Sequence, residues 1–259
     1  MSLLDLALAP LELVLSTILV TAHGALVAVG LPPASGVTWA ASIAALVVTV
    51  RLALLPLVVR QLRSARRLAA AAPVLQEIRE RHRGARDPQA LARMRTETAQ
   101  ATAEAGVSPW GCLPLLLQAP VLLSLFRVLN AAARGHAVGA LGPALVAQLD
   151  GATLAGASLT QTLLAGGPAA VVALALTAVM AGALWLAQHR QLTLNTPPAA
   201  LTSQRLLRWI APATAVVSGF TFPIGLLVYF ACANTLSLLQ QLAVIRWFPT
   251  PGSPAAARG

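Results

Sequence analysis

The sequence contains no lysine, and this absence excludes several kinds of catalytic and nucleotide-binding site. Among its 259 residues, all 18 residues in the Lys plus Arg total are arginines. A P-loop, a Schiff-base enzyme and a Ser-Lys dyad each require a lysine, so none of them is expected. The two cysteines, Cys112 and Cys232, lie 120 positions apart in apolar runs, which predicts neither a metal site nor a redox pair.

Charged residues are also scarce, and their scarcity excludes an ordinary water-soluble domain. They make up 10% of the chain, whereas hydrophobic residues make up 57%, and the mean hydropathy is +0.75. A chain this apolar has too few polar groups to cover a surface that faces water. Only 8 residues are acidic, so the formal net charge is +10. The composition predicts an all-α, polytopic membrane protein of bacterial type.

Long apolar runs predict five membrane-spanning helices, because roughly 20 apolar residues cross the hydrocarbon core. The uncharged run between Arg208 and Arg246 has 37 residues, too many for one crossing and just enough for two short ones. Glycines and a proline at 219–225 supply the turn between them. The predicted spans are 37–59, 109–130, 168–187, 208–222 and 223–245.

The amino-terminal segment, residues 1–36, is apolar but carries polar residues along one side of its predicted helix. Glu12, Ser16 and His23 fall on that side. Such a stripe favours a helix that lies in the membrane interface, on the extracytoplasmic side. A cleaved signal peptide is the alternative, although the segment lacks the positively charged start that is typical of one.

The distribution of arginine predicts how the chain is oriented. Ten arginines lie in residues 60–108, and a single one, Arg134, lies in the extracytoplasmic loop predicted over 131–167. Five more are predicted on the same side of the membrane as the ten: two in the cytoplasmic loop over 188–207, Arg208 itself, and two in the short tail over 246–259. The total on that side is fifteen arginines. The positive-inside rule then predicts an external amino terminus and a cytoplasmic carboxyl terminus.

Residues 60–108 are predicted to form a cytoplasmic helical hairpin. Its helices cover 62–83 and 88–105, with Gly84 and Pro88 at the turn. The hairpin is either a solvated helix pair near anionic lipid headgroups or a docking surface for ribosomal RNA or a targeting factor. The arginines expected to form this cytoplasmic recruitment surface are Arg63, Arg66, Arg67, Arg79, Arg81, Arg83 and Arg86.

Arg51 lies inside the first predicted span, nine residues before Arg60. An arginine at this depth costs roughly 3 kcal/mol on insertion scales, and no predicted span carries an Asp or Glu that would neutralise it. We therefore expect a hydrated groove, open to the cytoplasm, that attracts anionic groups. Besides Arg51, the hydroxyl and amide side chains expected to line this groove are Thr49, Gln118, Ser124, Ser218, Thr221, Tyr229, Asn234, Ser237 and Gln240.

Several motifs, taken in order along the chain, resemble those of the YidC-type membrane protein insertases. They are Val50-Arg51-Leu52, Pro56, Gln61, Pro73, the hairpin, Pro109-Trp110-Gly111-Cys112-Leu113-Pro114, Gln118-Ala119-Pro120-Val121, Phe222-Pro223-Ile224-Gly225-Leu226, Tyr229, Asn234 and Gln240-Gln241. The likeness extends from about Thr38 to Ile245. It implies a five-span core around a groove that is closed outside and open to cytoplasm and lipid.

The resemblance also implies how the groove is used. In that family the arginine matching Arg51 meets acidic residues of an incoming chain, and the spans matching the second and fifth here border its path. Nascent membrane proteins are the implied substrates; the Sec translocon, the ribosome, the signal recognition particle pathway and membrane lipids are further candidate partners. No cofactor, metal or catalytic residue is implied. The eleven residues after Phe248 are too few for a long basic ribosome-binding tail.

Two other functions are considered beside insertion. A small anion channel or transporter would use Arg51 as its binding charge, but the internal repeat typical of transporters is not found. A non-inserting chaperone would hold membrane subunits during assembly. An enzyme is not expected, because the four histidines are scattered and no HExxH or GxSxG motif occurs. The resemblance therefore implies an insertase of the bacterial plasma membrane that also helps new membrane proteins to fold, and the anion channel or transporter and the non-inserting chaperone are the alternatives.

Overall fold

The computed structural model describes residues 3–84, 87–107, 113–196 and 207–258, and most of these belong to helices. The longer helices are α1 (Leu3–Ala28), α2 (Gly36–Ala70), α4 (Pro88–Glu104), α5 (Leu113–Ala133), α7 (Gly167–Arg190), α9 (Leu207–Thr221) and α10 (Ile224–Trp247). The shorter elements are α3 (Ala72–Arg81), α6 (Pro143–Gly151), β1 (Thr153–Leu154), β2 (Ala157–Ser158), η1 (Leu163–Ala165), η2 (Gln191–Asn195) and η4 (Ala256–Arg258). The predicted all-α membrane protein is confirmed.

The lengths of the apolar helices bear on the predicted number of membrane crossings. Within the described ranges, four helical segments are long and apolar enough to cross: Leu8–Ala28, Gly36–Ala70, Gly167–Asn195 and Ile224–Trp247. The apolar parts described for α5 and α9 are shorter, Pro120–Ala133 and Trp209–Thr221. The five-span count therefore stays a prediction. Helix α10 begins and ends within two residues of the predicted last span, 223–245, and its 24 residues extend over about 36 Å.

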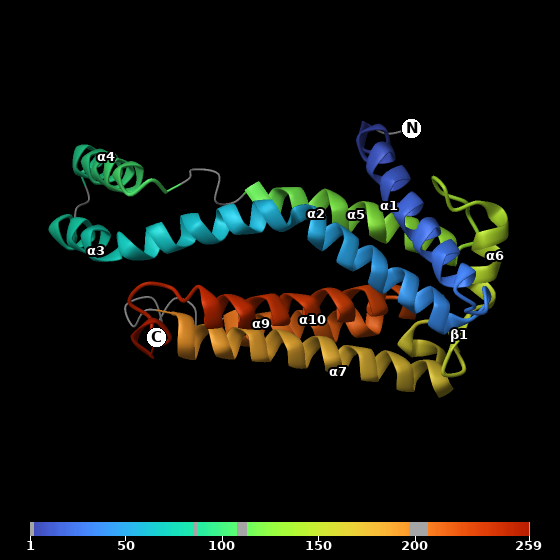
Figure 1. Cartoon of the computed structure of the whole chain (residues 1–259). Coiled ribbons are helices and arrows are strands. Elements are labelled where there is room, and N and C mark those ends of the chain that lie inside the picture. Colours follow the sequence, from blue (N-terminus) through green and yellow to red (C-terminus); the bar gives the residue numbers. More distant parts are fainter. Residues whose placement is uncertain (1–2, 85–86, 108–112, 197–206, 259) are drawn as a thin grey trace.

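Helix α2 continues well beyond the predicted span and carries the chain out of the bundle toward α3 and α4 (Figure 1). Its start is capped by Ser35, whose Oγ accepts a hydrogen bond from the N–H of Val37 at 3.2 Å. It ends at Ala70, because Pro73 in the first turn of α3 has no N–H to continue the helix. The single helix predicted over 62–83 is therefore wrong, since the structure divides it between α2 and α3.

Helices α7, α9 and α10 lie side by side, and α10 also packs on α2 (Figure 1). Trp39 of α2, Met180 of α7 and Leu227 of α10 belong to one buried core. Helices α9 and α10 are joined at Phe222 and Pro223, inside the predicted turn at 219–225.

The connection between α5 and α7 contains α6, the β1–β2 hairpin and η1, and lies at the opposite end of the molecule from α3 and α4 (Figure 1). It caps the start of α10. The carbonyl oxygens of Leu159 and Gln161 accept hydrogen bonds from the N–H groups of Gly225 and Ile224, both at 2.8 Å. A helix start leaves its first N–H groups without partners, so this Ala- and Gly-rich loop fixes where α10 begins.

Helix α1 packs on α2 and α5, and its polar stripe faces the protein. Ser16 is fully buried, His23 is 3% exposed, and the side chain of Glu12 is 12% exposed. The ring of His23 stacks on Trp39 with centroids 4.0 Å apart, and Ser16 Oγ accepts from the N–H of Ala140 at 2.9 Å. These contacts account for the stripe without an interfacial position. Whether α1 lies in the interface or crosses the membrane stays a prediction.

Candidate functional site

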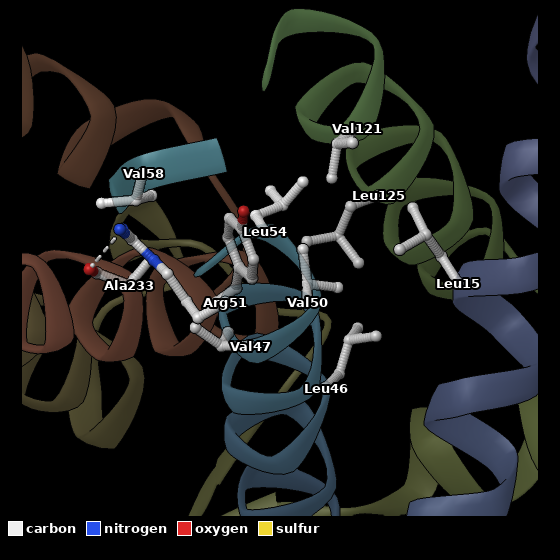
Figure 2. A pocket seen from close by; sticks show the side chains of 11 residues that line it. Leu15, Leu46, Val47, Val50, Arg51, Leu54, Val58, Val121, Leu125 and Ala233 are labelled. Atoms are coloured by element: carbon white, nitrogen blue, oxygen red, sulfur yellow. Dashed lines mark hydrogen bonds between the residues drawn. The ribbon is translucent and has the colours of Figure 1, made fainter. Parts of the chain in front are cut away.

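The side chain of Arg51 reaches from α2 to α10 (Figure 2). Its Nη2 donates hydrogen bonds to the carbonyl oxygen of Ala233, at 3.0 Å, and to the Oγ of Ser237. The Ser237 hydroxyl also donates to the Ala233 carbonyl, at 2.8 Å. Because Ala233 and Ser237 are four residues apart, they lie on the same face of α10. The guanidinium is thereby held at the contact between the two helices.

The groups described around Arg51 do not neutralise its positive charge. Both of its hydrogen-bond acceptors are neutral oxygens, and within the described ranges no carboxylate lies at ion-pair distance from it. An arginine side chain stays protonated in proteins. Because a half-buried charge is less screened than an exposed one, this guanidinium attracts anionic groups more strongly than a surface arginine does.

A narrow apolar pocket, partly open to the outside, lies beside Arg51 (Figure 2). Its walls come from α1, α2, α5 and α10. Arg51 and Tyr229 are the two polar side chains in a lining that otherwise comprises Leu15, Leu46, Val47, Val50, Leu54, Val58, Val121, Leu125 and Ala233. This lining differs from the expected ring of hydroxyls and amides, because the helices meet here through leucine and valine.

A second, wider and more polar pocket borders the guanidinium along α10. Besides Arg51 it is lined by Ser237, Gln240, Gln241 and Val244. The sequence-based prediction includes Ser237 and Gln240 but not Gln241, although Gln241 lies four residues after Ser237 and so on the same helix face. Arg51 thus lies where an apolar pocket and a polar pocket meet.

Four other residues predicted for the groove lie on α5 and α10. Tyr229 is 8% exposed and lines the apolar pocket, while Asn234 is half-buried on α10 next to Ala233. Ser124 is fully buried in α5, and its hydroxyl has no hydrogen-bond partner within the part of the chain that the structure describes. Gln118 belongs to α5, but its side chain lies outside the described ones.

Three predicted groove residues use their hydroxyl groups within their own helices. Thr49, Ser218 and Thr221 each donate to the carbonyl oxygen four residues earlier, at 2.8, 2.8 and 3.1 Å. Neither of the two pockets is lined by any of the three. A role for them in substrate binding stays a prediction.

The arginines predicted to form the recruitment surface lie on the last turns of α2, on α3 and in the turn that follows it. Arg67 Nη1 donates to the carbonyl of Gly106 at 2.8 Å and so connects α2 to the end of α4. Arg81 lies 3.5 Å from Glu77 and 3.6 Å from Glu97, so part of the positive charge is balanced locally. Arg66 is half-buried and Arg86 lies outside the described residues, whereas the exposed members are Arg63, Arg67, Arg79, Arg81 and Arg83.

The described residues contain no group of three or more His, Cys, Asp or Glu side chains that could hold a metal ion. The histidines occupy separate places. His189 stacks on Trp185 with ring centroids 5.0 Å apart, and His82 Nε2 lies 3.7 Å from Glu97. Among the described residues, neither His189 nor His82 lines a pocket beside Arg51.

The carboxyl-terminal segment, residues 249–258, folds back on η2 at the end of α7. The backbone N–H of Thr250 donates to Asn195 Oδ1 at 2.7 Å, and that of Ala255 donates to the carbonyl of Leu194 at 2.8 Å. Gln191 Oε1 accepts from Asn195 Nδ2 at 3.3 Å and from Gln241 Nε2 at 2.9 Å. Gln191 therefore connects the docked tail to a residue that lines the polar pocket.

Gln191→Met is expected to loosen the docked tail, because it leaves two amide donors without their acceptor. Of these two, Asn195 is buried, and an unsatisfied buried donor costs about 1–3 kcal/mol. Ser253, which is 3% exposed, reports the change when it is replaced by cysteine in a background without Cys112 and Cys232. Its thiol labelling rate should rise about tenfold for each 1.4 kcal/mol of lost local stability.

Gln188→Met is the matched control, because no hydrogen bond of the Gln188 side chain is found among the described residues. It should leave the labelling rate of the cysteine at position 253 unchanged. Equal labelling in Gln191→Met and in the parent protein would contradict the role of Gln191 in holding the tail.

The sequence of this chain is similar to those of named bacterial membrane proteins. The family model described as 60Kd inner membrane protein matches residues 31–251. A Bifidobacterium longum protein named membrane protein insertase YidC is 32% identical over an alignment of 264 positions, which covers 96% of this chain and 78% of the relative. A relative of the same name from Streptomyces avermitilis is 30% identical, and the match covers 86% of this chain and 55% of the relative. Another, from Tropheryma whipplei, is 32% identical, and the match covers 96% of this chain and 86% of the relative. The chain therefore belongs to the 60Kd inner membrane protein family, the YidC family that its motifs resemble.

Proposed function

We propose that this chain is a membrane protein insertase, which inserts newly made membrane proteins and helps them fold. Its relatives bear that name. The observation that carries the proposal is the position of Arg51, which keeps its charge where an apolar pocket meets a polar one. A client with a short polar tail before an apolar helix likewise has a polar segment and an apolar segment next to each other.

The physical task of an insertase is to move a polar tail across hydrocarbon, where each charge costs roughly 3 kcal/mol on insertion scales. Arg51 offers an acidic tail an opposite charge inside the apolar region. Ser237 and Gln240 offer hydrogen bonds to other polar groups in the tail. The client's apolar helix then partitions into lipid, which contributes about 25 cal/mol for each Å² removed from water. The partitioning of the client drives the reaction, so no nucleotide is required.

The proposed substrate-binding groove runs through the apolar pocket and the polar pocket that meet at Arg51. Arg51, Tyr229 and Ser237 border the two pockets directly and are assigned the first contacts with the client. The remaining residues are assigned to the path on either side of these pockets. They are Thr49, Gln118, Ser124, Ser218 and Asn234.

We further propose that the amino terminus is external and the carboxyl terminus cytoplasmic, in a bacterial plasma membrane. The arginine distribution supports this orientation, because fifteen arginines fall on the proposed cytoplasmic side. The exposed arginines of α2 and α3 are then available to recruit clients from the cytoplasm. The Sec translocon, the ribosome, the signal recognition particle pathway and membrane lipids are proposed as further partners.

Reconstitution of the purified full chain into liposomes tests the proposed function. A short-tailed, single-helix client is synthesised in their presence, and protease protection of its tail is measured without added nucleotide triphosphate after synthesis. Protection that depends on the reconstituted protein is the expected result. A chaperone that only holds its client would bind without protecting the tail, and an anion channel would release trapped chloride instead. Either of these two results would contradict insertase function.

A further inference from the structure

A chain of side-chain amides joins the carboxyl-terminal segment to the polar pocket. The backbone N–H of Thr250 donates to Asn195 Oδ1 at 2.7 Å. At the other end of the same amide, Asn195 Nδ2 donates to Gln191 Oε1 at 3.3 Å. Gln191 Oε1 also accepts from Gln241 Nε2 at 2.9 Å, and Gln241 lines the polar pocket together with Arg51. The hydrogen bonds therefore lead from the backbone of the tail to a wall of that pocket.

These hydrogen bonds have a fixed direction, because a backbone N–H group donates and cannot accept. Thr250 therefore requires the oxygen of Asn195, which leaves the Asn195 nitrogen for Gln191. That nitrogen requires the oxygen of Gln191, and the oxygen of Gln191 requires the nitrogen of Gln241. The end of the Gln241 amide that is turned away from Gln191 is then its oxygen, Oε1.

The carboxyl-terminal segment is held firmly enough to keep this direction. Asn195 is 4% exposed, so its amide has little freedom to turn. The N–H of Ala255 makes a second backbone hydrogen bond with η2, at 2.8 Å. Positions 249 and 251, on either side of Thr250, are prolines, which restrict the backbone there. The tail thus presents the Thr250 N–H to η2 from an ordered segment.

We propose that the docked carboxyl-terminal segment determines the specificity of the polar pocket, by turning Gln241 so that its Oε1 accepts hydrogen bonds from N–H groups of a client's tail. The inference rests on the proposed insertase function. Since an arginine only donates, Arg51 and Gln241 give one pocket both a donor and an acceptor. A tail that carries an ammonium or amide group next to a carboxylate matches both. Asn195 and Gln191 are positioning residues, because neither lines the pocket.

The variant N195D should reverse the direction of the amide chain while keeping its shape. A carboxylate at position 195 has two acceptor oxygens, so it still accepts from Thr250 but obliges Gln191 to present its nitrogen. Gln241 must then turn its oxygen toward Gln191, and its Nε2 becomes the end that is turned away. The polar pocket would lose an acceptor and gain a donor.

Two clients test this reversal in proteoliposomes that contain the full chain. Their tails carry the same aspartate and differ at one neighbouring position, which is lysine in one client and glutamate in the other. The ratio of lysine-client to glutamate-client insertion should fall at least about threefold in N195D, because a lysine loses its acceptor and a glutamate gains a donor.

The variant Q191E is the charge-matched comparison. It adds the same negative charge to the same group of residues, but its oxygens still accept from both Asn195 and Gln241, so the direction is kept. A negative charge by itself attracts the lysine client. The ratio in Q191E should therefore equal or exceed that of the wild type. The sign of the change thus separates the orientation of Gln241 from the added charge.

The variant T250P removes the N–H that sets the direction and adds no charge, so it also serves if N195D does not assemble. Its ratio should lie between those of the wild type and N195D, because Gln241 is then free to present either end. Thr250→Ala is the matched control, since it changes the side chain and keeps the N–H. This control should give the wild-type ratio.

Solvent exchange of the Gln241 side-chain amide protons, followed by nitrogen-15 NMR in detergent, reports the orientation without a client. Exchange should be slow in the wild type, where Nε2 donates to Gln191, and faster in N195D. A ratio in N195D equal to or above that of the wild type would overturn the inference, as would equal ratios in T250P and Thr250→Ala. Failure of the wild-type protein to insert either client would instead overturn the proposed insertase function.

Discussion

Replacing Arg51 by alanine is expected to lower the insertion of a client with an acidic tail at least about tenfold, which corresponds to roughly 1.4 kcal/mol. Arg51→Lys should retain most of the activity, because an ammonium group supplies the charge although it lacks the planar fork of a guanidinium. Insertion is measured by rescue of cells depleted of their own insertase. A client with a neutral tail should be inserted almost equally well by all three proteins.

The stability of the alanine variant separates loss of charge from loss of fold. The acceptors of Arg51 do not depend on it, since the Ser237 hydroxyl already donates to the Ala233 carbonyl at 2.8 Å. Removing a half-buried cation also removes a desolvation cost. Thermal unfolding in detergent should therefore occur at an equal or higher temperature than in the parent protein.

Arg60→Ala is the matched control for Arg51→Ala, because Arg60 lies nine residues later on α2 and is exposed. It should rescue insertase-depleted cells as well as the parent protein does. Normal insertion of the acidic-tailed client by Arg51→Ala would contradict the mechanism in which the arginine attracts the client.

The features that could be predicted from the sequence are those set by local pattern. Apolar runs and helix breakers place most of the long helices, and Pro223 ends α9 and begins α10 close to where a proline and glycines predict a turn. Arg51 is conspicuous in the sequence because a charge inside an apolar run is costly wherever the helix packs. The break between α2 and α3 is local as well, because it is set by Pro73 in the first turn of α3.

The partners of polar residues could not be predicted, because they depend on contacts between distant segments. Glu12 and Arg127 are each visible as charges in apolar runs, yet nothing local says that α1 lies against α5. The same holds for Gln191, whose acceptor oxygen meets Gln241 from another helix. A polar stripe such as that of α1 predicts a polar environment, and it does not distinguish water from the polar side of a neighbouring helix.

Hydroxyl side chains are the least informative candidates for a groove. Thr49 and Ser218 satisfy their hydrogen-bonding needs by donating to carbonyl groups of their own helices. Serine and threonine do this readily in helices, so their presence does not require a hydrated cavity. Ser237 does the same and in addition accepts from Arg51, a difference that only the packing of α2 on α10 reveals.

Replacing Gly36 by alanine is expected to destabilise the protein by about 3 kcal/mol or more, the upper range for overpacking. A Cβ at position 36 would lie 2.3 Å from the carbonyl oxygen of Thr153 and 2.7 Å from the backbone nitrogen of Leu154. These are backbone atoms of β1, so no change of rotamer relieves the clash. Thermal unfolding in detergent and resistance to unfolding by SDS measure the loss.

The loss of stability should also extend from β1 to α10, because the loop that contains β1 also caps the start of α10. Leu159 and Gln161 follow β2 and accept from the first N–H groups of α10 at 2.8 Å. Displacing β1 therefore disturbs the start of the helix that holds Ala233 and its contact with Arg51. Hydrogen exchange at Gly225 should accelerate in Gly36→Ala, even though position 36 belongs to a different helix.

Substitutions at two other glycines show whether the destabilisation of Gly36→Ala comes from its backbone contact or only from the loss of a glycine. Gly182→Ala is the matched control, since a Cβ there meets nothing within 4 Å, and alanine should stabilise α7 by up to about 1 kcal/mol. At Gly219, where a Cβ would lie 2.2 Å from Thr177 Oγ1, the obstacle is a side chain. Gly219→Ala should therefore be relieved by Thr177→Ala, whereas no side-chain substitution at Thr153 can relieve Gly36→Ala. A variant Gly36→Ala as stable as the parent protein would mean that α2 and β1 do not approach each other at their backbones.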